Sequence, residues 1–458
     1  MSCLRRLPAI SRRTMFSFTK KSLWQLPSSS APTIPQHELV DEEICPDYNP
    51  AAFHPAKPGQ VLAKNYQLLA KIGWGSQSTV WLARDISRNK WQSEETVALK
   101  IINNDNTDEA QHERMIERLV AERDPSHRGN VILRTSLDSF ELNGPEGKHM
   151  CLVYEPMREP LWILQKRFIN QNLPLPIAKA YIYILLNGLD YLHSSCKVVH
   201  TDLKLGNILM CFENDHLLSD FLERGQAMGY KIDNATGRSI FRCHNDFGPI
   251  KANEVKNFVP KISDFGLATL LDDPSPHDGV TTKQMGIYPI QPDHYRAPEV
   301  VLGCGWDFKA DIWNFGVLLW NIIGSTDLFN QAQDTHGRYD SKSHLAEMIS
   351  LLGPPPKELL ERSDSMSQQN WPQPVTNEMG ELCNNAREFF GGPFFSEDGE
   401  FSYPDLVPQG SLEHAVSFVE EKDREAFLSF ARDMLAWLPE ERKTARELMG
   451  HPFLTLGR

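Results

Sequence analysis

The hydrophobic pattern of the chain changes near residue 156, and no other feature constrains the fold as strongly. Before this point, short β-branched and apolar runs alternate with polar residues, as in residues 78–86 and 96–102. Such runs are typical of paired strands. After it, apolar residues recur at helical spacing, as in residues 176–195 and 309–323. The sequence therefore predicts an α+β fold, in which a small strand-rich part precedes a large helical part.

One helix is expected within the strand-rich part. Residues 108–123 place four apolar side chains on one helical face, with charged side chains opposite. We expect this face to be buried, and it consists of Met115, Ile116, Leu119 and Val120. Two further stretches, about 211–260 and about 353–410, are polar or rich in Pro and Gly, and we predict that they are insertions.

A glycine-rich turn precedes the strand at residues 78–86. In KIGWGSQSTVWL, Gly73, Gly75 and Val80 follow the spacing G-x-G-x-x-G-x-V, and Ser78 stands in place of the third glycine. Glycines at such a turn allow the backbone to approach the phosphates of a nucleotide. Taken alone, an ordinary hairpin turn explains the match better, because isolated glycine-rich matches are weak.

A lysine and a glutamate could act on those phosphates together. Lys100 ends the strand sequence Val-Ala-Leu-Lys, so its side chain projects from one defined face; a solvent-exposed lysine is the alternative. Glu113 follows thirteen residues later in the predicted helix, where it could pair with Lys100. Glu117 competes for this role, but Glu113 is preferred because it precedes the apolar step at Met115.

The polar segment VVHTDLKLGNILM, residues 198–210, has the composition of a phosphoryl-transfer loop. Asp202 and Asn207 are five positions apart, as in H-R-D-x-x-x-x-N, and Thr201 stands where that motif has Arg. Asp202 would accept the proton of a substrate hydroxyl, Lys204 would neutralise the transferring phosphate, and Asn207 would bind one Mg²⁺. The alternative is a polar turn before a short strand at Ile208.

Two triplets follow this loop in the chain. A D-F-G triplet begins at Asp264, which would bind the Mg²⁺ that bridges the phosphates of ATP, while Phe265 would pack inward. An A-P-E triplet ends thirty-five residues after Asp264, at Glu299, and Arg442 is expected to be its buried partner. A D-F-G triplet alone is a common turn, so it counts only together with the other motifs.

The order and spacing of these motifs are hard to produce by chance. They predict a protein kinase, whose required residues are Lys100, Glu113, Asp202, Asn207, Asp264 and Glu299. The alternative is a catalytically weak or inactive pseudokinase that serves as a nucleotide-binding scaffold. It is disfavoured because degenerate kinases usually lose one of these residues. A kinase for lipids or small molecules is disfavoured by the A-P-E segment, which shapes a peptide site.

Four stretches make the match more specific: IGWGSQSTVWLARD, HTDLKLGNILM, YRAPEV and LAEMISLLGPPP. They resemble the serine/arginine-rich protein kinases, in their fungal form, over about residues 46–454. This resemblance implies a two-lobed protein kinase fold. An antiparallel sheet and one helix would form the lobe 66–156, and mostly helices the lobe 157–454. Residues 41–65 would lead into the fold, and residues 1–40 would form a separate basic segment.

The resemblance also implies the chemistry. The chain would be a serine/threonine protein kinase that uses ATP and Mg²⁺, with Tyr154 as the gatekeeper and residues 155–157 as the hinge that binds adenine. Asn207 and Asp264 would be the metal ligands. The residues expected to contact the nucleotide are Ile72, Gly73, Gly75, Ser78, Val80, Ala98, Lys100, Glu155, Met157 and Leu209.

A protein substrate is implied, but two differences leave a preference for Arg-Ser repeats open. Family members carry a run of acids before the histidine matched by His344, where this chain has Asp340 followed by Ser-Lys-Ser. The residues before Tyr295 are also less basic than expected. The net charge of −13, from 47 Lys and Arg against 60 Asp and Glu, suits basic substrates and argues against wholesale nucleic-acid binding.

The absent Arg in the catalytic loop concerns regulation. In many kinases this Arg pairs with a phosphorylated residue and so orders the activation segment. Thr201 cannot form such an ion pair, whereas the residue types of Asp202, Lys204 and Asn207 are kept. We therefore predict activity without phosphorylation of the activation segment.

The first 37 residues have a composition of their own. They contain Arg and Ser, and no acidic residue occurs before Glu38. Both a mitochondrial presequence and a basic disordered tail fit this composition, and otherwise a cytoplasmic or nuclear protein is expected. In either case we expect the segment to lie outside the fold. Its basic residues include Arg5, Arg6, Arg12, Arg13, Lys20 and Lys21.

The remaining features predict a monomer that does not bind membranes. The best apolar run, residues 315–324, is about half of the roughly 20 residues that a membrane-spanning helix needs. The eight cysteines are scattered without metal-ligand spacing, which indicates buried thiols in a reducing compartment.

Overall fold

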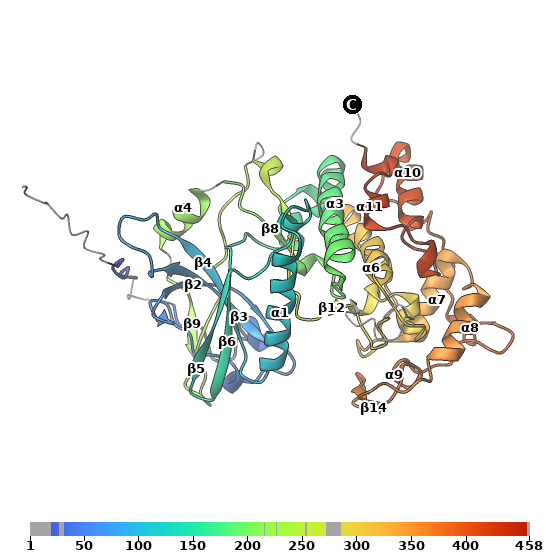
Figure 1. Ribbon diagram of the computed structural model, residues 1–458, viewed down its shortest axis with the longest axis horizontal. Helices are drawn as coiled ribbons and strands as arrows, with labels where there is room; N and C mark the ends of the chain where they lie inside the picture. The colour runs from blue at the N-terminus through green and yellow to red at the C-terminus, as the bar shows by residue number, and fades with distance from the viewer. Residues whose placement is uncertain are drawn as a thin grey trace, which may run out of the picture. The chain divides into compact units, whose positions relative to one another are not determined.

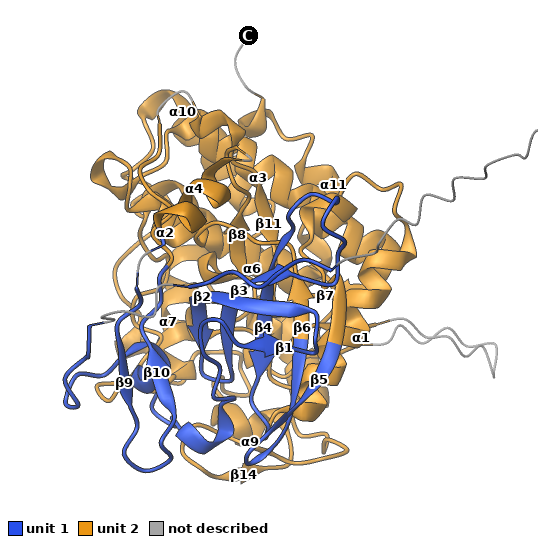
Figure 2. Ribbon diagram, turned by 90° about the vertical axis from the view of Figure 1, so that its left-hand side faces the viewer, with its two compact units in different colours: residues 1–104, 140–151, 225–244 blue, residues 105–139, 152–224, 245–458 orange. Residues whose placement is uncertain are grey.

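The computed structural model describes residues 20–26, 32–214, 216–225, 227–251, 254–271 and 285–455. These residues pack as two compact units (Figure 2). Unit 1 takes its described residues from 1–104, 140–151 and 225–244, and unit 2 takes its own from 105–139, 152–224 and 245–458. The units differ from the lobes 66–156 and 157–454 implied by the family resemblance, and those lobe boundaries stay a prediction.

A six-stranded sheet dominates unit 1 (Figure 1). Its order is β1-β2-β3-β4-β6-β5, and the register pairs β1 with β2, β2 with β3 and β3 with β4 in antiparallel fashion. The paired strands predicted at residues 78–86 and 96–102 are confirmed. The strands are β1 (Val61–Leu62), β2 (Tyr66–Gly75), β3 (Ser78–Asp85), β4 (Thr96–Ile102), β5 (Asp138–Gly144) and β6 (Gly147–Tyr154).

One face of this sheet is closed by segments from elsewhere in the chain. Lys71 of β2 and Trp81 of β3 are register partners on that face, and both side chains are buried. The hairpin of β9 (Tyr230–Ile232) and β10 (Ser239–Phe241) covers them, with the ring of Phe241 5.8 Å from that of Trp81. Glu42, from a short 3₁₀ helix, forms buried ion pairs with Lys71 and with Arg238 of the hairpin connection.

The N-terminal basic segment also takes part in unit 1. Lys21 is only 7% exposed and pairs with Glu94 at 3.0 Å. The backbone of Trp24 exchanges two hydrogen bonds of 2.9 Å with the side chain of Gln67, and Arg84 lies over the Trp24 ring at 4.6 Å. Residues 20–26 are thus part of the fold, which corrects the expectation for this segment. Arg5, Arg6, Arg12 and Arg13 lie outside the described residues.

Unit 2 is mostly helical, as predicted. One face of α3 (Leu175–Asp190), which includes Ala178, Ile182 and Leu185, is buried, and in α6 (Lys309–Leu319) every residue after Lys309 is buried. Gly316 allows close packing there, because a Cβ at this position would lie 2.9 Å from Cδ2 of Leu435. The helices are α1 (Thr107–Arg123), α2 (Leu161–Gln165), α3 (Leu175–Asp190), α4 (His216–Arg224), α5 (Pro298–Val301), α6 (Lys309–Leu319), α7 (Ser341–Leu352), α8 (Lys357–Met366), α9 (Ala386–Phe390), α10 (Glu421–Arg432) and α11 (Ala445–Leu448).

Helix α1 buries a different face from the one predicted. Ile116 and Val120 are fully buried, but Met115 is 53% exposed. The buried face instead includes the carboxylates of Glu113 and Glu117, which a hydrophobic pattern assigns to the solvent side. The expectation for Met115 was therefore wrong, because polar partners inside unit 2 decide the orientation of this helix.

Short strand pairs frame the polar loop of unit 2. Strand β7 (Val198–Val199) enters the loop and pairs with β12 (Thr269–Leu270). Strand β8 (Ile208–Met210) leaves it and pairs with β11 (Pro260–Ile262). The D-F-G triplet lies between β11 and β12, so the two motifs are held side by side. A further pair joins β13 (Val375–Thr376) to β14 (Leu382–Cys383).

The seven cysteines that the structure describes carry free thiols, and four of them are buried. No helix among the described residues is long and apolar enough to cross a membrane.

Candidate active site

The glycine-rich turn forms a tight hairpin in unit 1. Gly73 pairs with Val80 and Gly75 with Ser78, so that only two residues close the turn between β2 and β3. A Cβ at Gly73 would lie 3.3 Å from Cβ of Val80, which is tighter than most side-chain contacts. Trp74, between the two glycines, is 40% exposed. The two glycines therefore leave the backbone of β2 without side chains next to the turn, as a phosphate lid requires.

The expected nucleotide-facing residues of β3 and β4 share one face of the sheet. Val80 is the register partner of Lys100, and Leu82 is that of Ala98. Val80 and Lys100 are half-buried, although most of their neighbours in both strands are buried. Ile72 in β2 is half-buried as well. The flat base of a nucleotide could lie on this half-buried patch of the sheet, with its phosphates near Lys100. The proposed pair of Lys100 with Glu113 stays a prediction.

Asp202 is held in a single orientation in unit 2. Its carboxylate accepts hydrogen bonds from Lys204 Nζ at 2.9 and 3.0 Å and from Asn207 Nδ2 at 2.8 Å. Asn207 Nδ2 also donates to the backbone oxygen of Asp202 at 2.9 Å. The residues that the motif spaces apart thus converge on one carboxylate. Asp202 is buried, whereas the Lys204 side chain is 42% exposed and can move.

Asp311 anchors this loop from beneath, and sequence reasoning missed it. Its two carboxylate oxygens accept the backbone N–H groups of His200 at 2.7 Å and Thr201 at 2.9 Å. Asn314, one turn along α6, donates to the backbone oxygen of Leu203 at 2.7 Å. Both side chains are fully buried. The signal was present, because two polar residues three positions apart in an otherwise apolar helix need buried partners.

Thr201 occupies a strained position and links the loop to the segment after D-F-G. Its φ of 67° is unusual for a β-branched residue. The hydroxyl donates to the backbone oxygen of Leu267 at 2.7 Å, and the side chain is buried. Phe265 packs inward as predicted, fully buried and with its ring 5.2 Å from that of His200. The loop and the D-F-G triplet are therefore joined without any charged residue at position 201.

The two expected metal ligands lie close together. The backbone oxygen of Asn207 accepts the N–H of Ser263 at 2.9 Å, and Ser263 directly precedes Asp264. Asp264 has a φ of 70°, a conformation that strained functional positions often show. Because Asn207 Nδ2 is turned toward Asp202, its amide oxygen is the atom it can offer to a cation. Amide and carboxylate oxygens are suitable ligands for Mg²⁺.

Tyr154 connects the two candidate acids of α1. Its hydroxyl lies 2.9 Å from Oε1 of Glu117 and 3.3 Å from Oε1 of Glu113. Burial, together with these two carboxylates, raises the pKa of Tyr154 well above its ordinary value, so the phenol stays a donor. Glu117 also accepts the N–H of Ser136 at 3.0 Å. Glu113 points the other way, since its Oε2 would be 4.0 Å from a Cβ at Gly266. Its proximity to the D-F-G triplet favours Glu113 for the predicted role.

The segment just after the expected hinge forms a bridge with β8, whose Leu209 is expected to contact the nucleotide. Met157 is buried, whereas Glu155 is exposed and pairs with Lys261 at 2.8 Å. Leu209 is half-buried between the buried Ile208 and Met210, and it bridges to Pro160 just after the hinge. Leu209 thus lies on the opposite side of β8 from Ile208 and Met210, which face the core.

The A-P-E triplet is locked as expected. Arg442 donates to both carboxylate oxygens of Glu299, at 2.7 and 2.6 Å, and neither side chain is appreciably exposed. This bidentate geometry is the strong form of an ion pair. The prediction that Arg442 is the partner of Glu299 is confirmed.

Comparison with known proteins decides what this arrangement is. The family model described as "Protein kinase domain" matches residues 66–235 and 250–454. The chain belongs to the protein kinase family. A serine/threonine protein kinase of Aspergillus fumigatus is 32% identical to this kinase over 437 residues, covering 93% of this chain and 94% of that protein.

Two further comparisons refine the assignment. The serine/threonine-protein kinase SRPK of Physarum polycephalum is 30% identical over 90% of this kinase and 91% of its own length. A crystal structure of a kinase domain matches with a TM-score of 0.59 at 22% identity, covering 89% of this kinase and all of that chain, which supports the fold. The resemblance to the serine/arginine-rich protein kinases is thereby confirmed. The protein is a serine/threonine protein kinase, and the pseudokinase alternative is not supported.

Proposed function

We propose that this kinase transfers the γ-phosphate of ATP to serine and threonine hydroxyls with Asp202 as the general base. The observation that carries the proposal is the fixed carboxylate of Asp202, which Lys204 and Asn207 hold from two sides at 2.8–3.0 Å. A general base must lie within about 2.6–3.2 Å of the proton that it accepts. Fixing the carboxylate before the substrate arrives favours this geometry, because no reorganisation is then needed during the reaction.

The residues of the kinase fit ATP with Mg²⁺. Asp264 supplies a carboxylate and Asn207 an amide oxygen, and Mg²⁺ is usually bound by one or two such groups together with phosphates. When bound, Mg²⁺ offsets the charge on the phosphates. Lys204, whose side chain is 42% exposed, can leave Asp202 and follow the transferred phosphate. Lys100 and the glycine hairpin would hold the remaining phosphates.

The proposed substrates are basic proteins with Arg beside the modified Ser, bound less selectively than by family members that carry a run of acids before the histidine matched by His344. The net charge of −13 favours such partners only as a diffuse field. Asp340, the acid that remains before His344, is already used as the N-cap of α7. It accepts the N–H of Lys342 at 3.2 Å and the hydroxyl of Ser343 at 2.8 Å. Little acidic charge is therefore left at this point to hold an Arg-rich segment.

A peptide comparison tests the substrate class. Purified kinase is incubated with γ-labelled ATP and Mg²⁺ and with three peptides of equal length, namely an Arg-Ser repeat, a Lys-Ser repeat and an acidic Ser peptide. The same reactions are run with Asp202→Ala. We expect the Arg-Ser peptide to incorporate the most labelled phosphate, only modestly more than the Lys-Ser peptide. A preference for the acidic peptide would contradict the substrate class without touching the assignment of Asp202.

The kinase is further proposed to act without phosphorylation of its activation segment. Thr201 ties the catalytic loop to Leu267 through a neutral hydrogen bond of 2.7 Å. His112 of α1 contacts the backbone oxygen of Ala268 at 2.7 Å and so fixes α1 to the same segment. These two contacts order the activation segment of this chain, as an ion pair between a phosphate and an Arg does in other kinases. Phosphatase treatment of the recombinant enzyme should leave its activity unchanged.

Localisation and assembly are also proposals. Removal of the first 19 residues keeps Lys20–Leu26, which pack in unit 1, and so tests targeting without loss of that contact. An organelle signal that disappears on truncation supports a presequence, and an unchanged distribution removes it. A monomer is expected, and light scattering of the purified chain measures this directly.

A further inference from the structure

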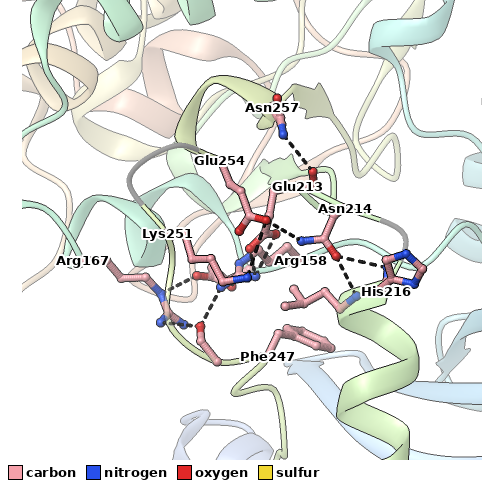
Figure 3. A network of polar contacts seen from close by, with 12 residues as sticks. Arg158, Arg167, Glu213, Asn214, His216, Phe247, Lys251, Glu254 and Asn257 are labelled. Atoms are coloured by element: carbon pink, nitrogen blue, oxygen red, sulfur yellow. Dashed lines mark hydrogen bonds and ion pairs between the residues drawn. The ribbon is translucent and has the colours of Figure 1, made fainter.

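A cluster of buried charges lies directly after the hinge (Figure 3). It consists of two arginines and two glutamates, so its formal charges cancel. The side chains of Arg158 and Glu213 are 0% exposed and that of Glu159 is 1% exposed. Arg167 is 28% exposed and approaches Glu159 at 2.5 Å. Three fully buried ionic groups are costly to assemble, so their partners must all be in place.

Arg158 is the centre of the cluster. Its Nη1 donates to both oxygens of Glu213, at 2.7 and 2.9 Å, and its Nε lies 3.0 Å from Oε2 of Glu159. Its Nη2 donates to the backbone oxygen of Gly248 at 2.8 Å. One planar guanidinium thus donates hydrogen bonds to Glu213 and Gly248 and lies within ion-pair distance of Glu159. A lysine ammonium could not reproduce this arrangement, because it lacks the rigid fork of donors.

The backbone at Arg158 ties the hinge to β8. Its N–H donates to the backbone oxygen of Met210 at 2.8 Å, and the N–H of Met210 donates to the oxygen of Glu159 at 3.3 Å. Strand β8 carries Leu209 and directly follows Asn207. A shift at Arg158 would therefore be transmitted to Leu209 and to Asn207, the proposed metal ligand.

The side chain of Arg158 ties the same point to the insertion at about 211–260. Glu213 lies at its beginning and Gly248 in its second half. A second link closes these two arms, since Asn257 donates to the backbone oxygen of Glu213 at 3.3 Å. Asn214 also donates to Glu254 at 3.2 Å (Figure 3). Both arms of the insertion therefore converge on Arg158.

We infer that Arg158 is a positioning residue for the nucleotide, and that the insertion acts on ATP binding through its Glu213. This inference rests on the proposed function, in which the hinge binds adenine and Asn207 binds Mg²⁺. Loss of the Arg158 side chain would leave Glu213 and Glu159 buried with only the half-exposed Arg167 nearby. The backbone would then have to move to hydrate them, and with it the hinge and β8.

The test is the variant Arg158→Met, studied as the full chain with ATP, Mg²⁺ and a Ser peptide. We expect KM for ATP to rise about tenfold, within the range usual for coupled sites. KM for the peptide should change by less than about twofold. Calorimetric titration with ATP and Mg²⁺ should show the same loss of affinity without any turnover.

A matched control separates positioning from stability. Arg446 pairs with the buried Asp190 in the same unit, at 2.9 and 3.1 Å, but its side chain is 66% exposed and it has no backbone bond to β8. Arg446→Met should lower the melting temperature and leave KM for ATP unchanged. If both variants change KM for ATP alike, or if neither does, the positioning role is refuted.

Two more variants keep the test decisive if Arg158→Met folds poorly. The double variant Arg158→Met/Glu213→Met removes one stranded carboxylate, and it should recover stability but not the full ATP affinity. Glu213→Gln keeps the shape and loses the charge, and it should raise KM for ATP by a smaller factor. An ATP affinity equal to that of wild type in both would contradict the inference. Failure of the wild type to bind ATP would instead refute the proposed function.

Discussion

The hydroxyl of Thr201 is predicted to order the activation segment, as a charged Arg at this position does in phosphorylation-dependent kinases. Thr201→Val keeps the β-branched shape in its strained conformation and removes only the donor to Leu267, now 2.7 Å away. Thr201→Ser keeps the hydroxyl and serves as the matched control. The proposed general base Asp202 and the proposed metal ligand Asn207 are untouched in both variants.

The size of the effect follows from the burial of this bond. A hydrogen bond of this kind contributes about 0.5–1.5 kcal/mol, and an acceptor left without a partner can cost about 1–3 kcal/mol. Each 1.4 kcal/mol shifts a population about tenfold. If the ordered arrangement of the activation segment is only modestly more stable than its alternatives, Thr201→Val should lower the ordered population, and with it kcat, about tenfold. KM for ATP should hardly change, because residue 201 is not among the residues expected to contact the nucleotide.

Steady-state kinetics on a Ser peptide, before and after phosphatase treatment, is the assay. Thr201→Ser should retain more than about half of the activity, which corresponds to less than 0.5 kcal/mol. This role of the Thr201 hydroxyl is refuted if the activity of Thr201→Val equals that of wild type. It is equally refuted if Thr201→Ser is as impaired as Thr201→Val, because the hydroxyl would then not be the relevant group.

Two stability predictions follow from buried charges. Arg442→Met strands the carboxylate of Glu299 and should lower the free energy of unfolding by about 3–5 kcal/mol in urea titrations; a loss below 1 kcal/mol would show that the pair is dispensable. Burial would raise the pKa of Glu42, but Lys71 and Arg238 outweigh it and hold the pKa below 4.5. As the pH falls, the unfolded chain takes up this proton first, so the stabilisation is present above about 4.5 and is lost below it. Glu42→Gln should therefore be less stable at pH 7 and should lose less stability between pH 5 and pH 3, and a wild-type slope in that range would contradict the pair.

The sequence predicted the parts of the fold and site that depend on residue type at fixed spacing. Strand pairing at β3 and β4 follows from local alternation, and the convergence of Asp202, Lys204 and Asn207 lies within one short loop. The Glu299–Arg442 pair was also predictable, because opposite charges in apolar surroundings need each other. In these cases a short stretch of chain contains enough information.

Other features depend on distant partners and could not be predicted locally. Met115 is exposed because α1 buries Glu113 and Glu117 against Tyr154, so a hydrophobic pattern selects the wrong face. Lys21 joins unit 1 through Ser93, seventy-two residues away, although its segment has no periodicity of its own. The buried cluster around Arg158 could not be predicted either, since Glu213 and Gly248 come from a stretch that resembles a polar loop.

The most direct test of the central claim is phosphate transfer by Asp202→Asn, measured beside its nucleotide affinity. Asn keeps the size of the side chain and can still contact Lys204, so the loop should stay folded and ATP with Mg²⁺ should bind within about threefold of wild type, which is less than 1 kcal/mol. Without a carboxylate to accept the hydroxyl proton, the rate of transfer to a Ser peptide should fall by about 10²–10⁴-fold. Equal rates for wild type and Asp202→Asn, with ATP bound in both, would contradict the account.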